Sequence, residues 1–122
     1  MLKKLSFLFI LFAALTLNAG AQIKEVNAKE VKTILGTEKG WTVIDVRTPA
    51  EFKEGHVPGA LNIDIHQDDA FTKIGKLKKD GKYIVYCRTK NRSGVAADYM
   101  VKNGFKTVYQ MIDGIGGWNS VQ

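Results

Sequence analysis

Cysteine and histidine are scarce in this chain. Its 122 residues include one cysteine and two histidines. A single cysteine cannot form an internal disulfide, and without a Cys-x-x-Cys motif or a second, resolving thiol the sequence argues against a self-contained disulfide oxidoreductase. The cysteine and the histidines also lack the spacing of zinc ligands. We therefore predict no metal site and no organic cofactor.

Acidic residues are fewer than basic ones, which gives a formal net charge of +6. The lysines Lys73, Lys76, Lys78 and Lys79 are not interleaved with aromatic residues, and no nucleic-acid-binding motif accompanies them. We interpret them as a solvated face and predict no nucleic-acid partner. The positive charge would attract small anions by electrostatic steering.

A long apolar run occurs only at the N-terminus. Two lysines precede a nearly apolar stretch at residues 5–17, and small residues follow it. This order predicts a secretory signal peptide at residues 1–21 and one domain at residues 22–122, located in the periplasm or secreted. The run is shorter than the roughly 20 residues that cross a bilayer, so we expect no stable membrane insertion after cleavage. An uncleaved tether is the alternative.

Alternating strand and helix patterns follow the N-terminal segment. We expect strands at residues 41–46, 60–63, 82–86 and 106–109, and helices at residues 27–36, from Thr48, from Asp68 or Asp69 to Ile74, and at residues 93–103. Capping residues mark two of these helix starts, at Asn27 and Thr48. Strands that alternate with helices predict a parallel α/β sheet, which binds ligands beyond the carboxyl ends of its strands.

The one cysteine, Cys87, lies at such a strand end and opens a basic loop. Arg88, Lys90 and Arg92 follow it, and a helix is expected from Ser93. Cationic neighbours and a helix N-terminus favour the thiolate form of a cysteine, which is the nucleophilic form. A purely structural, buried cysteine would gain nothing from these cations. We therefore predict a nucleophile at Cys87 and an anionic ligand.

The length of this loop separates two kinds of chemistry. Cysteine phosphatases use the spacing Cys-x5-Arg to surround a tetrahedral phosphate, whereas Cys87 and Arg92 have the spacing Cys-x4-Arg. The shorter loop forms a tighter cradle, which suits one extra sulfur atom carried on the cysteine. A cysteine phosphatase or an arsenate reductase is therefore the less favoured enzyme alternative.

Two further motifs flank the loop. The stretch VIDVRTPAEF occupies residues 43–52 and is followed by EGHVPGA at residues 54–60, and DGIGGW occupies residues 113–118. With the Cys-x4-Arg loop, these motifs resemble the rhodanese-like sulfurtransferase family from about residue 24 to the C-terminus. The resemblance implies a central parallel sheet of about five short strands flanked by helices on both faces. One departure is Lys90, at a position that is often glycine in small rhodaneses.

The loop chemistry and the resemblance together predict a thiosulfate sulfurtransferase. Cys87 would take a sulfane sulfur from thiosulfate or a similar anionic donor and pass the resulting persulfide to cyanide or a thiol. The predicted substrate-binding loop comprises Arg88, Thr89, Lys90, Asn91, Arg92 and Ser93, with backbone N–H groups facing the sulfur and the cations holding the donor. A non-enzymatic persulfide carrier or a protein-interaction module is the alternative from another functional class.

Asp45 and Arg47 are predicted to support this site. The resemblance places Asp45 at the end of the strand beside the loop, where its carboxylate could accept loop N–H groups or pair with an arginine. We favour structural support of the loop for both residues, with contact between Arg47 and the substrate as the alternative. Glu51 is interpreted as the helix-start partner of Thr48, and His56 as an architectural residue.

Overall fold

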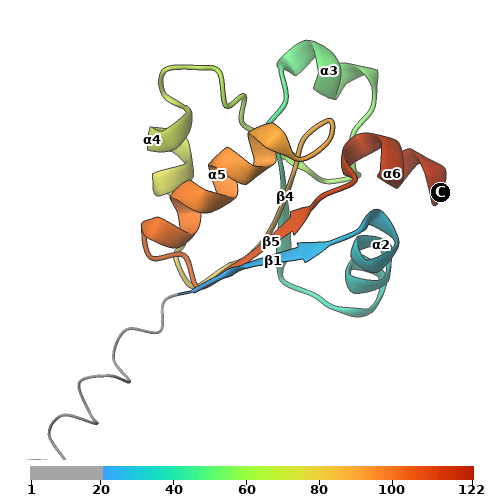
Figure 1. Cartoon of the computed structure of the whole chain (residues 1–122), viewed down its shortest axis with the longest axis horizontal. Helices are drawn as coiled ribbons and strands as arrows, with labels where there is room; N and C mark the ends of the chain where they lie inside the picture. The colour runs from blue at the N-terminus through green and yellow to red at the C-terminus, as the bar shows by residue number, and fades with distance from the viewer. Residues whose placement is uncertain (1–20) are drawn as a thin grey trace, which may run out of the picture.

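The structure is a computed structural model that describes residues 21–122, so the signal peptide predicted at residues 1–21 lies almost entirely outside the described residues. Five parallel strands form one sheet in the order β1-β5-β4-β2-β3 (Figure 1). The strands are β1 (Ile23–Val26), β2 (Trp41–Asp45), β3 (Leu61–Asn62), β4 (Lys82–Tyr86) and β5 (Thr107–Met111). The predicted parallel sheet of about five short strands is confirmed.

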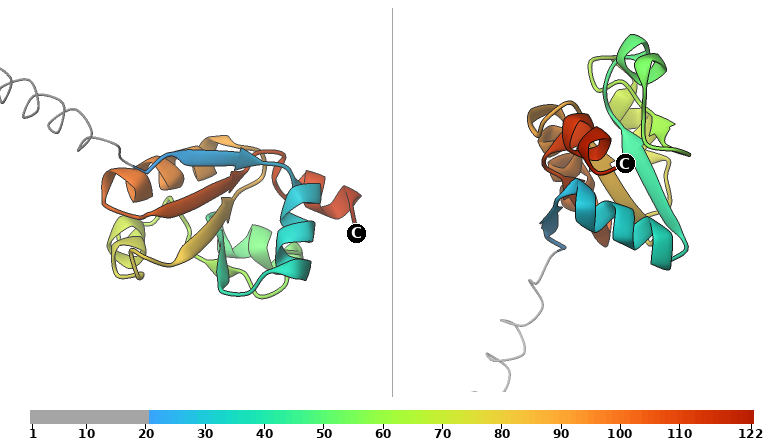
Figure 2. Two further views of the ribbon diagram at one scale, coloured as in Figure 1. Left: turned by 90° about the horizontal axis from the view of Figure 1, so that it is seen from below. Right: turned by 90° about the vertical axis from the view of Figure 1, so that its right-hand side faces the viewer.

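In the described part of the chain, five helices connect and follow the strands. They are α2 (Ala28–Thr37), α3 (Pro49–Glu54), α4 (Ala70–Gly75), α5 (Asn91–Lys102) and α6 (Gly114–Ser120). Helices α4 and α5 contribute buried residues to one face of the sheet, and α2 and α6 contribute to the other (Figure 2). Helices therefore cover both faces, as the sequence predicted.

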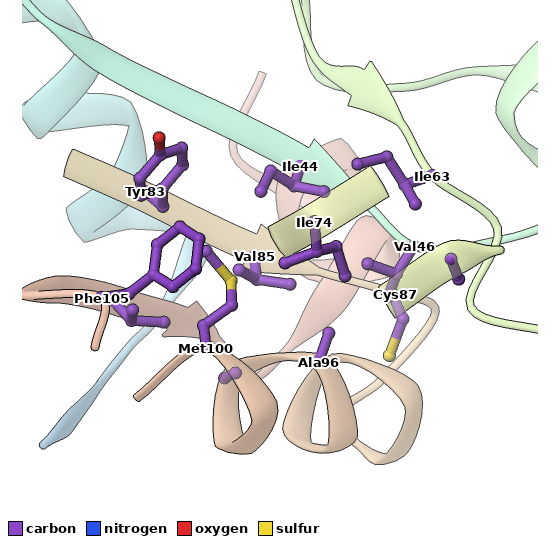
Figure 3. Packing of buried hydrophobic residues seen from close by; sticks show 13 residues of the cluster. Ile44, Val46, Ile63, Ile74, Tyr83, Val85, Cys87, Ala96, Met100 and Phe105 are labelled. Atoms are coloured by element: carbon purple, nitrogen blue, oxygen red, sulfur yellow. The ribbon is translucent and has the colours of Figure 1, made fainter. Parts of the chain in front are cut away.

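Strand β4 shows how the alternation of side chains divides the core. Tyr83, Val85 and Cys87 point into the cluster beneath α4 and α5, and this cluster is drawn in Figure 3. Ile84 and Tyr86 point into the cluster beneath α2 and α6. Because successive side chains of a strand face opposite sides, burial of both faces requires the continuous apolar run observed in β4.

Two helix starts follow the capping chemistry that the sequence predicts. The Asn27 side chain accepts the N–H of Glu30 at 2.8 Å, and the Glu30 carboxylate accepts the N–H of Asn27. Thr48 and Glu51 form the equivalent pair at the start of α3, where Pro49 occupies the first turn. Each box satisfies N–H groups that have no partner within the helix.

The structure corrects the predicted elements at three places. Strand β1 and helix α6 were not predicted, and α5 begins at Asn91, two residues before the expected start at Ser93. Strand β1 has four residues with no strong apolar alternation, and its pairing with β5 holds it in the sheet. Helix α6 contains three glycines, which have low helix propensity, so only tertiary contacts reveal it.

Within residues 21–122, no helix combines the length and the apolar character needed to cross a membrane. The longest helix of this part of the chain, α5, has 12 residues.

Gly114 allows α6 to begin against the loop that follows β4. Its φ is +62°, and a Cβ atom at this position would overlap the carbonyl group of Arg88. The next residue, Ile115, donates its N–H to the carbonyl of Cys87 at 3.1 Å. The left-handed backbone and the close approach both require glycine, so this residue holds the backbone that follows β4.

We expect Gly114→Ala to lower the free energy of unfolding by about 2–4 kcal/mol, because the added Cβ meets backbone and the φ is strained. Gly116→Ala is the matched control in the same helix, where a Cβ would meet open space. The control should be neutral or stabilising by up to about 1 kcal/mol. Urea unfolding of the two variants measures both effects, and equal stabilities would contradict the assigned role of Gly114.

Candidate functional site

Cys87 follows the last residue of β4, the central strand of the sheet. Its residue is 1 % exposed, and Figure 3 shows its sulfur pointing toward α5. A central strand of a parallel sheet is held by hydrogen bonds on both sides, so its carboxyl end is a rigid place for a reactive atom. The sulfur is thus presented at the carboxyl edge of the sheet.

Ser93 provides the polar contacts of the Cys87 sulfur. The Ser93 backbone N–H donates to Sγ at 3.3 Å, and the Ser93 Oγ lies 3.4 Å from Sγ. Ser93 belongs to the first turn of α5, whose backbone N–H groups have no partners within the helix. The turn therefore places both a backbone donor and a hydroxyl beside the sulfur.

The loop between β4 and α5 is exposed around this buried sulfur. Arg88, Thr89, Lys90 and Asn91 are exposed, and none of the ion pairs in residues 21–122 includes Arg88 or Lys90. Lys90 has a φ of −139°, so the loop places no left-handed residue at the position where the resemblance leads one to expect glycine. A lysine therefore fits this backbone without strain.

Arg92 lies in a different environment because Glu51 binds it. Its NH1 and NH2 groups donate to the two carboxylate oxygens of Glu51 at 2.7 and 3.0 Å. The Arg92 guanidinium, and to a smaller extent the Thr48 groups, lower the pKa of Glu51 from 4.5 to about 2, although partial burial opposes the shift. The same pair raises the pKa of Arg92. Glu51 thus joins the start of α3 to the start of α5.

Sequence reasoning assigned Glu51 to its neighbour Thr48, and the structure confirms that contact, with Glu51 Oε1 accepting both the Thr48 N–H and hydroxyl. The sequence did not reveal the second partner of Glu51, Arg92, which lies 41 residues away. Arg92 was predicted to hold the anionic donor together with Arg88 and Lys90. In the structure its guanidinium is already paired, whereas the other two cations remain exposed.

Asp45 and Arg47 form a buried ion pair beside the loop. The Arg47 NH2 lies 2.7 Å from Asp45 Oδ2 and also donates to the Gly55 carbonyl at 2.7 Å. Tyr86 donates its hydroxyl to the same Asp45 oxygen at 2.6 Å. Burial and this hydrogen bond raise the pKa of Tyr86, and although burial opposes it, the Asp45 carboxylate raises the pKa of Arg47.

These contacts describe a supporting cluster beneath the loop. Asp45 and Tyr86 are register partners on β2 and β4, and Tyr86 immediately precedes Cys87. Arg47 is 4 % exposed, with its hydrogen bonds directed at protein groups. The carboxylate of Asp45 thus has an arginine as its partner, one of the two partners that the sequence left open, and support of the loop by both residues stays a prediction.

Gln110 is a site residue that sequence reasoning missed. It lies on β5, is 5 % exposed, and donates from Nε2 to the Lys90 carbonyl at 2.8 Å and to Ser93 Oγ at 2.9 Å. The available signal was one amide side chain within the otherwise apolar end of a short strand. That signal alone does not reveal which loop the side chain reaches.

One open groove of the described residues lies elsewhere. It has a volume of about 430 Å³ and is lined by residues from β1, α2 and β5, among them Val26, Ile34 and Tyr109, and not by Cys87. We assign the site from the chemistry around the sulfur and not from this groove. Within residues 21–122, no three His, Cys, Asp or Glu side chains cluster closely enough to hold a metal ion.

The arrangement around Cys87 combines a sulfur that accepts hydrogen bonds with exposed cations on the same loop. Donors directed at a sulfur stabilise negative charge on it. Arg88 and Lys90 add positive potential at the surface, where a small anion can arrive. Such a site can carry out a nucleophilic displacement by sulfur on an anionic substrate.

Comparison with known proteins agrees with this chemistry. The sequence matches the family model described as Rhodanese-like domain over residues 27–121. It is 37% identical over 84 residues to the thiosulfate sulfurtransferase GlpE of Pseudomonas aeruginosa, covering 69% of this chain and 74% of that protein. It is also 26% identical to the proposed sulfur carrier protein YrkF of Bacillus subtilis, covering 80% of this chain and about half, 52%, of that protein.

Solved structures show the same architecture. The crystal structure of a rhodanese-related protein from Thermoplasma volcanium superposes with a TM-score of 0.70 at 28% sequence identity. The superposition covers 80% of this chain and 92% of that chain.

The Glu51–Arg92 pair predicts a pH-dependent stability. Because the pKa of Glu51 is lower in the folded chain than its ordinary value, its stabilisation is present above about pH 4.5 and is lost as the pH falls toward about 2. We expect Glu51→Gln to lower the free energy of unfolding at neutral pH by about 1–2 kcal/mol, reduced by partial solvent screening. The deficit should shrink as the pH is lowered.

Urea unfolding at a series of pH values measures this deficit. Asp98→Asn is the matched control, because it breaks an exposed ion pair with Lys102 on α5 and should cost less than about 0.5 kcal/mol. A Glu51→Gln deficit that stays constant down to pH 2.5 would show that the ion pair is not its source.

Proposed function

The chain belongs to the rhodanese-like domain family, and we propose that it is a thiosulfate sulfurtransferase that works through a persulfide on Cys87. Sulfur transfer in general follows from the family and from the sulfurtransferase relatives. The persulfide, the identity of the nucleophile and the donor are our proposal. The observation that carries it is the Cys87 sulfur at the carboxyl end of β4, which accepts the Ser93 N–H, lies 3.4 Å from Ser93 Oγ and is followed by exposed cations.

In the first half-reaction, the Cys87 thiolate attacks the outer sulfur of thiosulfate. A new sulfur–sulfur bond forms on Cys87, the original sulfur–sulfur bond of the donor breaks, and sulfite leaves with the bonding electron pair. No proton moves in this step, so no general base is required. The exposed Arg88 and Lys90 would hold the anionic sulfonate end of the donor.

In the second half-reaction, a thiophilic acceptor attacks the outer sulfur of the persulfide. With cyanide, the product is thiocyanate; with a thiolate, it is the acceptor persulfide. In both cases the electron pair of the broken sulfur–sulfur bond returns to Cys87 as a thiolate. The Ser93 N–H that contacts Sγ stabilises this returning charge, and the N–H groups of the loop residues 88–92 are proposed to face the outer sulfur.

Two features support different roles for the three loop cations. Arg92 is held by Glu51 in two hydrogen bonds, so we assign it to fixing the start of α5. Arg88 and Lys90 are exposed and are assigned to donor binding. Asp45 and Arg47, bound to each other and to Tyr86 or Gly55, are assigned to support of the strand end that carries Cys87.

A persulfide carrier is the second candidate function. The proposed sulfur carrier from Bacillus subtilis is the observation that favours it, since a carrier needs the same loop to hold a single sulfur. The two functions differ in turnover: a carrier accepts one sulfur and stops until its partner removes it. An enzyme continues for as long as donor and a small acceptor are present.

We predict that the purified protein transfers sulfur from thiosulfate to cyanide over many turnovers and that Cys87→Ser abolishes the reaction, because the serine cannot carry the persulfide sulfur. Thiocyanate formation measures turnover, and intact-mass analysis after thiosulfate treatment measures the gain of one sulfur atom. Thr107→Ser, at the amino end of β5 and so away from the loop, serves as the control and should retain activity.

Each result of this experiment has a definite meaning. Sulfur loading on Cys87 without turnover would replace the enzyme with the carrier. The absence of both loading and turnover would contradict the persulfide proposal, and turnover that survives in Cys87→Ser would assign the chemistry to another residue.

We also propose that the protein is exported. The basic N-terminus, the apolar stretch at residues 5–17 and the small residues that follow support removal of residues 1–21. Expression of the full chain in a bacterium should yield a periplasmic product whose N-terminal residue is Gln22, as read by N-terminal sequencing. Replacing Leu11 with Arg in the apolar stretch should leave the full-length chain in the cytoplasm, and an unprocessed periplasmic or membrane-bound chain would contradict cleavage.

A further inference from the structure

Gln110 reaches the catalytic loop from beneath, from the strand next to β4. It shares the sheet face of Val108, which packs in the same cluster as Cys87. Its side chain is 5 % exposed and donates to the Lys90 carbonyl and to Ser93 Oγ. Gln110 does not contact the sulfur in any described hydrogen bond, and of its two partners, the Lys90 carbonyl and Ser93 Oγ, only the Ser93 hydroxyl also contacts the sulfur.

The orientation of the Gln110 amide is fixed by its partners. A carbonyl oxygen can only accept, so the amide nitrogen must face the Lys90 carbonyl at 2.8 Å. The second hydrogen of this nitrogen then points to Ser93 Oγ at 2.9 Å. Both amide hydrogens are therefore used within the site, and Ser93 Oγ accepts one of them.

The hydroxyl hydrogen of Ser93 has two possible acceptors, the Lys90 carbonyl at 3.3 Å and Cys87 Sγ at 3.4 Å. The Lys90 carbonyl already accepts two shorter hydrogen bonds, from Gln110 at 2.8 Å and from the Gly94 N–H at 2.9 Å. A carbonyl oxygen has two lone pairs, so both are occupied. The sulfur is thus the better acceptor for the Ser93 hydroxyl.

We propose that Gln110 is a positioning residue that turns the Ser93 hydroxyl toward Cys87 and so stabilises the thiolate. With the hydroxyl turned this way, the sulfur accepts two hydrogen bonds from Ser93, one from O–H and one from N–H. These two hydrogen bonds stabilise the deprotonated sulfur. A protonated sulfur would instead donate to Ser93 Oγ. The Ser93 hydroxyl would then have to donate to the Lys90 carbonyl, which already accepts two hydrogen bonds. Gln110 therefore disfavours the thiol arrangement.

Charged groups around the sulfur bear on the same equilibrium and must stay constant in the test. On the elements packed about Cys87 they are Arg88, Lys90 and Arg92 of the loop and α5, Asp45 and Arg47 near the end of β2, Glu51 of α3, Asp64 and His66 after β3, and Asp113 before α6. Gln110 makes no hydrogen bond to any of these charged side chains in the described residues. Replacing it therefore changes no ion pair.

Gln110→Met removes both amide donors and keeps an unbranched side chain of similar size. The ultraviolet absorbance of the thiolate, with Cys87→Ser subtracted, is followed from about pH 4 to about pH 9. We expect Gln110→Met to shift the thiolate–thiol equilibrium about fivefold toward the thiol, and Ser93→Ala to shift it at least as much. The double variant should equal Ser93→Ala alone, because Gln110 acts through the Ser93 hydroxyl.

Met111→Leu is the matched control, since Met111 is the next residue of β5 but packs on the opposite face. It should leave the ionisation curve unchanged. An unchanged curve in Gln110→Met, or a Gln110→Met effect of equal size in the Ser93→Ala background, would overturn the proposal. Should Gln110→Met fail to fold, Ser93→Ala still tests the proposal. An unshifted ionisation curve in Ser93→Ala would show that the Ser93 hydroxyl does not stabilise the thiolate, and it would overturn the proposal.

This inference deepens the proposed function and rests on it for its catalytic consequence, which is a larger share of nucleophile at acidic pH. The two can fail separately. Thiolate shifts without thiocyanate formation would retain the role of Gln110 and reject the sulfurtransferase proposal. Thiocyanate formation with unshifted ionisation curves would retain the enzyme and reject Gln110 as a positioning residue.

Discussion

The end of β4 is the constraint on which the site depends, because it is held on both faces of the sheet and by the start of α6. On one face, Tyr86 binds Asp45, which also pairs with Arg47. On the other, the Cys87 sulfur contacts Ser93. The Cys87 carbonyl accepts the N–H of Ile115, an approach that Gly114 makes possible. Alternation along one strand thus separates structural support from chemistry by a single residue.

The cations of the loop differ in what they can do, although they look equivalent in sequence. The Arg92 guanidinium donates two hydrogen bonds to Glu51. This ion pair fixes the first turn of α5 and offsets much of the positive charge there. Arg88 and Lys90 keep their charge at the surface. In the proposed function, an anionic donor would therefore meet positive potential at the loop surface, while the sulfur accepts a hydrogen bond from the uncharged Ser93 N–H.

Sequence patterns revealed the elements whose signals lie in neighbouring residues. They missed the elements and ion pairs that depend on contacts between distant residues. The caps at Asn27 and Thr48, the apolar strand before Cys87 and the alternation of strands and helices are local signals, and they predicted the fold class and the loop. Helix α6 has weak intrinsic propensity, and its start depends on contact with the Arg88 backbone. The pairing of Glu51 with Arg92 joins residues 41 positions apart, for which no periodicity exists.

The buried polar contacts around Ser93 explain why the site can be ready before a substrate arrives. The Ser93 N–H is held in position by the first turn of α5, which in turn is fixed by Arg92 and by the bonds to the Lys90 carbonyl. In the proposed mechanism, dipoles that already point at the charge would need no reorientation when that charge returns to sulfur, and this preorganisation would lower the barrier to each transfer. Because Cys87 is only 1 % exposed, water competes little for the sulfur, so each hydrogen bond counts for more than it would at the surface.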